Sequence, residues 1–101
     1  MRVLMFLRPT NRHGTKGAYT SFRKALVSRG FVLLQPEVFL ASARSRRAAE
    51  HLMAQMRTAA PPTGAVCALV LTERQYASMT YLVGGPSYQE LAAGEWGNVN
   101  L

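Results

Sequence analysis

Residues 31–41 read FVLLQPEVFLA, and this stretch decides the fold class of the chain. Most of its residues are apolar, but Pro36 lies at its middle and cannot donate a hydrogen bond to a sheet. The chain therefore bends at Pro36, turns back there as a second strand, or lies at a sheet edge. If it turns back, this one stretch supplies two neighbouring strands.

Before this stretch, the sequence predicts one strand, one loop and one helix. Residues 2–7 form a short apolar run that ends at an Arg-Pro pair, which is typical of a buried strand. Residues 9–17 are polar and contain Pro and Gly, so we expect a loop. A helix should follow over residues 18–28, where apolar side chains recur at helical spacing. These apolar side chains are Tyr19, Phe22 and Leu26.

After this stretch, the sequence predicts a second helix and one or two further strands. Ser45 is suited to cap a helix over residues 46–59. Residues 65–71 are continuously apolar, which favours a central strand. A polar turn over residues 72–75 then leads to residues 76–83, which we interpret as a further strand or an irregular segment at the sheet edge.

The order of these elements predicts an α+β fold. We expect a ferredoxin-like βαββαβ sandwich with an additional C-terminal edge strand, in which two helices cover one face of an antiparallel sheet. The domain should span residues 1–85, and residues 86–101 should form a C-terminal tail. Many unrelated functions use this fold, so the fold class alone assigns no function.

The composition indicates the kind of partner. The chain has 101 residues, which is enough for one domain, and its net charge is +7. With a pI of about 10.6, it should bind a polyanion, either nucleic acid or an anionic membrane surface. No apolar run approaches the roughly 18 residues of a membrane span, and the short apolar start is unlike a secretory signal. We therefore expect a cytoplasmic protein.

No group of residues predicts catalysis or metal binding. Asp is absent, and the five Glu are too scattered for a carboxylate metal cage. The two imidazoles, His13 and His51, have no Cys or Asp nearby in the sequence to complete a ligand set or a triad. The single Cys67 excludes an internal disulfide and a multi-cysteine zinc site, and we expect it to be buried and inert. We predict no catalytic residues, no metal ligands and no cofactor.

Three groups of cations support a binding function. The first group lies beside the N-terminus of the first helix, where unpaired backbone amides favour a phosphate. Aromatic residues do not interleave with the cations, so contacts to a duplex backbone are favoured over stacking on single strands. A basic surface that is merely solvated is the alternative. The groups are Arg8, Arg12, His13 and Lys16 in the loop, Arg23, Lys24 and Arg29 on the first helix, and Arg44, Arg46 and Arg47 at the second helix.

Five motifs in order resemble one known family. They are AYTSFRKALVSRGFVLLQPEVF at 18–39, AE at 49–50, APPTGAV at 60–66, LTERQYASM at 71–79 and VGG at 83–85. The series is similar to CRISPR-associated protein two, a small dimeric partner of the integrase in spacer acquisition, and most similar to its branch in type two CRISPR systems. No single motif is specific, but five in order at this spacing are, and the match covers about residues 2–85.

The resemblance implies a homodimer that bridges integrase subunits and binds double-stranded prespacer DNA without sequence preference. Tails such as residues 86–101 often pack on a partner subunit in this family. We expect DNA contacts at Arg8, Arg12, Lys16, Arg23 and Lys24, contacts to DNA or the integrase at Arg44, Arg46 and Arg47, and a dimer interface at Tyr76, Met79, Tyr81 and Val83.

The chain departs from the family pattern at two places. The family reads Phe-Asp-Leu-Pro-Thr at the end of the first strand and binds metal through the Asp, whereas this chain has Leu7 there, followed by Arg8. Leu offers no anionic oxygen, so we expect no metal-dependent cleavage. Pro36 and Glu37 stand where the family prefers Tyr-Ser, which affects the expected dimer contact. A nuclease that uses Mg²⁺ and an unrelated ferredoxin-like RNA-binding or toxin-like module are the alternative functions.

Overall fold

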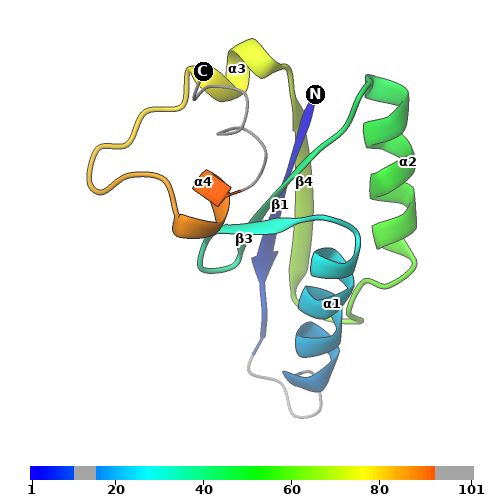
Figure 1. Cartoon of the computed structure of the whole chain (residues 1–101). Coiled ribbons are helices and arrows are strands. Elements are labelled where there is room, and N and C mark those ends of the chain that lie inside the picture. Colours follow the sequence, from blue (N-terminus) through cyan, green and yellow to red (C-terminus); the bar gives the residue numbers. More distant parts are fainter. Residues whose placement is uncertain (11–15, 93–101) are drawn as a thin grey trace.

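The computed structural model describes residues 1–10 and 16–92, without the side chains of residues 91 and 92. It is an α+β structure with the predicted ferredoxin-like arrangement. The four strands are β1 (Arg2–Arg8), β2 (Val32–Gln35), β3 (Val38–Ser42) and β4 (Ala65–Leu71), and all three strand pairs are antiparallel. They lie in the order β2-β3-β1-β4. The helices α1 (Lys16–Ser28) and α2 (Arg46–Arg57) pack on one face of this sheet (Figure 1).

Of the three possibilities at Pro36, the structure has the one in which the chain turns back. β2 and β3 are joined by a tight turn at Pro36 and Glu37, so Pro36 does not have to donate to a sheet ladder. Glu37 has a positive φ of 64°, which is uncommon for a residue other than glycine. Its carbonyl accepts a hydrogen bond from the Leu7 amide at 2.8 Å, which ties the turn to β1.

Both long helices match the sequence pattern. The three apolar residues predicted for α1, Tyr19, Phe22 and Leu26, are buried against the sheet. Ser45 caps α2, because its hydroxyl oxygen accepts a hydrogen bond from the Ala48 amide at 3.0 Å. The helices differ from prediction at their ends: α1 starts two residues before residue 18, and α2 ends two residues before residue 59.

The prediction that residues 65–71 form a central strand is wrong, because β4 is an edge strand. Its helix-facing residues Val66 and Val70 pack on the core, but the opposite face is open. On that face Leu69 is half-exposed and Cys67 is exposed, so the prediction of a buried Cys67 is also wrong. An apolar run predicts a strand that is covered on both faces, but it does not specify that the same chain supplies both covers.

The additional strand expected over residues 76–83 is not present. The chain after β4 forms α3 (Glu73–Ala77), then an irregular segment, then α4 (Tyr88–Ala92), and the structure has no strand between residues 72 and 92. The physical reason lies in the residues expected to form a polar turn. The Thr72 hydroxyl accepts from the Gln75 amide and the Gln75 side chain accepts from the Thr72 amide, a capping box that starts a helix.

Candidate nucleic-acid and subunit interfaces

The structure separates the predicted cations into two sets at opposite ends of the sheet. Arg8 ends β1, and Lys16 begins α1 at that same end (Figure 1). At the other end of β1, Arg2 pairs with Ser42, the last residue of β3. The second set of cations follows Ser42 in the sequence and therefore lies at this other end. The seven residues of β1 put roughly 20 Å between the two ends. The second set consists of Arg44, Arg46 and Arg47, all of which are exposed.

The end of the sheet beside Arg8 and Lys16 is hollowed. One hollow of about 320 Å³ borders Arg8, and another of about 380 Å³ borders Lys16. Both of these cations are exposed. Pro9 and Thr10 line both hollows, so the two lie side by side. The arrangement offers cationic groups to an anion that lies across this end of the sheet.

A hydrogen bond from Tyr19 and the small size of Gly64 stabilise the surface of these two hollows. The Tyr19 hydroxyl donates to the carbonyl of Thr63 at 2.8 Å, which fastens the segment before β4 to α1. Gly64 has a φ of +83°, and an added Cβ atom would lie 2.3 Å from the Tyr19 hydroxyl oxygen. Another residue at Gly64 would therefore push Tyr19 away and disturb the surface beside Arg8.

The remaining predicted DNA contacts differ in how accessible they are. Lys24 is exposed on α1. Arg23 is half-buried and forms an ion pair with Glu37, whose hydrogen bond raises the pKa of the Arg23 guanidinium. Arg12 and His13 lie outside the described residues. The assignment of all five DNA contacts stays a prediction, but the structure shows that Arg23 already has an anionic partner.

The residues at the end of β1 do not fit the divalent ion that the resemblance associates with this position. Leu7 is 6% exposed and belongs to the apolar core. The carboxylate of Glu37, whose backbone contacts Leu7, is held by Arg23 instead. The described residues contain no group of three or more His, Cys, Asp or Glu side chains that could hold a metal ion. No catalytic step through a metal is therefore assigned to this site.

The exposed apolar residues of the segment between α3 and α4 form the second candidate interface. Leu82 and Val83 are 92% and 91% exposed, and Met79 is also exposed. The sequence prediction included Met79 and Val83 but missed Leu82, although it lies between two residues that were named. Tyr76 and Tyr81 are partly buried and bind Glu90 of their own chain through their hydroxyl groups. The dimer interface itself stays a prediction.

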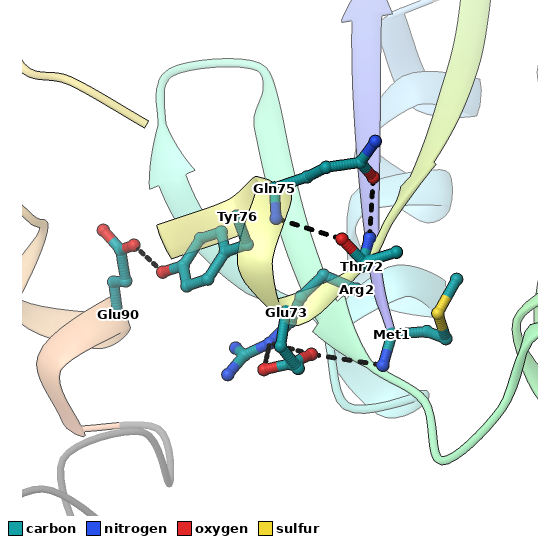
Figure 2. Close-up of polar contacts among 7 residues, drawn as sticks. All are labelled: Met1, Arg2, Thr72, Glu73, Gln75, Tyr76 and Glu90. Atoms are coloured by element: carbon teal, nitrogen blue, oxygen red, sulfur yellow. Dashed lines mark hydrogen bonds and ion pairs between the residues drawn. The ribbon is translucent and has the colours of Figure 1, made fainter. Parts of the chain in front are cut away.

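A polar clamp holds the segment after β4 to the start of the chain (Figure 2). The Glu73 carboxylate lies 3.1 Å from the N-terminal ammonium group and 3.0 Å from Nε of Arg2. The Arg2 guanidinium lies over the Tyr76 ring, 4.5 Å from its centre. The Tyr76 and Tyr81 hydroxyls both donate to Glu90. α3 and the start of α4 are thus fixed relative to β1.

The tyrosine hydroxyls of this clamp stay protonated over the neutral range. Burial and the hydrogen bond to Glu90 raise the pKa of Tyr81 to about 12. The same two causes raise the pKa of Tyr76 above its usual range. Glu90 is buried and receives both hydroxyl donors, so its side chain is hydrogen-bonded in the interior.

The first residues of the predicted tail pack on their own chain. The Ser87 hydroxyl donates to the carbonyl of Leu33 at 2.7 Å, and the Leu33 amide donates to the Gln89 side chain at 3.0 Å. β2 and β4 are both edge strands. These contacts occupy the backbone groups of Leu33 on the outer edge of β2, whereas the described residues make no such contact to the outer edge of β4. Contact between residues 86–101 and a partner subunit stays a prediction.

Replacing Glu73 by Gln should lower stability at neutral pH. Burial raises the pKa of the Glu73 carboxyl, but the N-terminal ammonium and Arg2 outweigh this and lower it from its ordinary value of 4.5. A lowered pKa means that the ionised carboxylate stabilises the fold above that ordinary value, and that this contribution is lost as pH falls through the folded-state pKa. Glu73 is 57% exposed, so screening should limit the effect to about 1 kcal/mol or less.

The measurement is urea denaturation of wild type and Glu73→Gln between pH 7 and pH 3. The difference in unfolding free energy should shrink toward zero below about pH 4.5. Glu50→Gln, at an exposed position on α2, is the matched control and should change stability little at any pH. A Glu73→Gln difference that persists unchanged at pH 3 would show that the ion pairs are not its cause.

Fold and surfaces together define a small α+β protein with a basic end, an open apolar strand edge and no metal cluster within residues 1–10 and 16–92. No helix in the described part of the chain is long and apolar enough to cross a membrane. No family model matches the sequence.

Curated relatives assign the family. The chain is 34% identical to a protein of Lacticaseibacillus rhamnosus, over 81% of each chain. It is 36% identical to one of Acidovorax ebreus over 89% of each, and 31% identical to one of Treponema denticola over 94% of this chain and 95% of the relative. All three relatives are described as CRISPR-associated endoribonuclease Cas2. The chain therefore belongs to the Cas2 family of CRISPR-associated proteins, which confirms the resemblance and makes the unrelated-module alternative wrong.

Proposed function

We propose that this protein is a scaffold of CRISPR adaptation, the step that acquires new spacers. In this role a homodimer bridges integrase subunits and binds double-stranded prespacer DNA without sequence preference, in the cytoplasm. The observation that carries the proposal is the basic end of the sheet, where the exposed cations Arg8 and Lys16 border adjoining hollows. Cations displayed in this way suit phosphates, and phosphates look alike in every DNA sequence.

Two-fold symmetry makes this surface long enough for a duplex. A homodimer would carry twice the net charge of +7, and each basic end would have a counterpart across the axis. The open edge of β4 and the exposed residues Leu82 and Val83 support such pairing, because a monomer rarely leaves an apolar edge uncovered. The exposed set at Arg44, Arg46 and Arg47 lies at the other end of the sheet, which favours a contact to the integrase there.

A metal-dependent endonuclease is the second candidate, because the relatives are named endoribonucleases. The buried Leu7 at the end of β1 argues against it, since Mg²⁺ prefers several oxygen ligands. The scaffold role requires no chemistry at that position. We therefore propose binding without cleavage, with Mg²⁺ relevant only if cleavage is found.

One assembly experiment tests the proposal against this alternative. The purified protein is mixed with the integrase and a labelled duplex in buffer containing Mg²⁺ or Mn²⁺, and the products are separated by size. We expect one complex that contains all three components and releases full-length strands on denaturation. Failure to join integrase and duplex would reject the scaffold role. Strand cleavage that follows this protein through purification would favour the nuclease.

A further inference from the structure

Arg23 and Glu37 form an ion pair inside the hollow that borders Lys16. Nε of Arg23 lies 3.0 Å from one carboxylate oxygen, and Nη2 lies 2.7 Å from the other. The pair joins the middle of α1 to the turn between β2 and β3. Both side chains are 35% exposed, so a ligand that entered the hollow from solvent could reach the guanidinium.

The backbone holds the Glu37 carboxylate in this place. Glu37 lies in a two-residue turn with a φ of 64°, and its carbonyl accepts from the Leu7 amide at 2.8 Å. A non-glycine residue keeps such a backbone conformation when the surrounding structure fixes it. The carboxylate is therefore a built part of the hollow and differs from a solvated surface acid.

The contact has the geometry by which Arg binds a phosphate. A guanidinium presents paired N–H groups that fit two oxygens of a carboxylate or of a phosphate equally well. Glu37 occupies the Nε and Nη2 edge of Arg23, which is one of the edges that a DNA phosphate would need. Lys16, the other cation that borders the hollow, is exposed.

We propose that this hollow is a phosphate subsite for the DNA backbone, and that Glu37 is a built-in competitor for Arg23 within it. The inference rests on the proposed duplex binding and deepens it. In the wild-type protein, Lys16 faces the duplex with its full charge, whereas Arg23 is neutralised by Glu37. Glu37 thereby lowers the affinity for DNA and limits how many phosphates each subunit contacts.

Two other roles for Glu37 predict different results. If Glu37 only ties the turn to α1, its removal lowers stability and leaves DNA binding unchanged. If Glu37 orients Arg23 for a phosphate, its removal weakens binding. Competition alone predicts that loss of the carboxylate strengthens binding and that the gain depends on Arg23.

The test is a duplex titration across a range of salt concentrations with four variants, the integrase being present at constant concentration. Glu37→Gln should bind more tightly, and its log–log salt slope should steepen by about 0.9 for each subunit, or about 1.8 for a dimer. Glu50→Gln changes the net charge equally on an exposed face of α2 and should leave the slope unchanged. Arg23→Ala should bind more weakly than wild type, because it leaves the Glu37 carboxylate unpaired in the hollow. Arg23→Ala combined with Glu37→Gln should show no gain over wild type, because these two positions together are then neutral again.

The outcomes separate the two proposals. If wild type binds duplex but Glu37→Gln matches Glu50→Gln or binds more weakly, the competitor role is wrong and the scaffold function stands. If wild type binds no duplex at low salt, the proposed function fails, and the competitor role fails with it. Should Glu37→Gln not fold, Glu37→Asn serves the same test, because Asn adopts positive φ more readily.

Discussion

The variant Leu82→Ser with Val83→Ser should be a monomer at concentrations where the wild-type protein is a stable homodimer. Both side chains are almost fully exposed in the single chain, so their removal should not disturb its fold. In a two-fold dimer the interface would bury two copies of each side chain, four in total. Full burial of an aliphatic side chain stabilises by roughly 1.5–3 kcal/mol, so four of them contribute roughly 6–12 kcal/mol at most. A loss of about 6 kcal/mol would raise the dissociation constant of the dimer by about four orders of magnitude.

Light scattering coupled to size exclusion measures this effect. Wild type should show twice the chain mass of 11.1 kDa, and the double variant should show the chain mass itself. Val27→Ser on α1 is the matched control, because Val27 is also exposed but lies outside the segment between α3 and α4. Wild type at the monomer mass, or a double variant that remains a dimer, would contradict the proposed interface.

The parts of the fold that local sequence determines were predicted well. The spacing of Tyr19, Phe22 and Leu26 places all three on one side of a helix, and such periodicity needs no distant contact. Ser45 as a cap is local in the same way. Pro36 allowed three outcomes, because whether a strand turns back depends on which neighbour it pairs with. The sheet resolves this through the pairing of β3 with β1.

The errors come from contacts that a single segment cannot specify. Residues 65–71 are apolar on both faces, and this pattern does not tell whether the cover is the same chain or another subunit. Cys67 was misplaced for the same reason. The helix α3, in contrast, had a sequence signal that was overlooked: Thr72 followed three residues later by Gln75 is the pattern of a capping box.

The cations could be named from the sequence, but their neighbours could not. Arg23 and Glu37 are separated by 14 residues, and they meet because the turn between β2 and β3 lies beside α1. The net charge counts Arg23 as an unpaired cation, whereas in the structure Arg23 forms an ion pair with Glu37. The sequence placed Arg8 and Lys16 in one loop, whereas the structure has them at the end of β1 and the start of α1, at the same end of the sheet (Figure 1).

Replacing Arg12 and Lys16 by Ala should sharply reduce both the affinity for duplex DNA and its salt dependence. Lys16 begins α1 at the basic end of the sheet, and Arg12 precedes it by four positions in the sequence, outside the described residues. Two subunits would lose up to four phosphate contacts, and each contact contributes about 0.9 to the log–log salt slope. The slope should therefore fall by roughly 3–4.

A matched control separates this local loss from the change in net charge. Arg29 follows the C-terminal end of α1, and Arg74 lies in α3 beyond the far end of β4, and both are exposed. Replacing these two by Ala removes the same charge at the opposite end of the sheet. Its effect on the slope should be much smaller, because screened charges beyond about 10 Å contribute little.

The most direct test of the account is the salt dependence of duplex binding for these three proteins, measured from low to moderate salt with the integrase present and with two unrelated duplex sequences. We expect the two sequences to bind alike, wild type to lose affinity steeply with salt, and the Arg12→Ala, Lys16→Ala variant to show the shallower slope that the Arg29→Ala, Arg74→Ala control does not. Equal affinity and equal slope for wild type and the first variant would show that the basic end of the sheet does not bind the DNA.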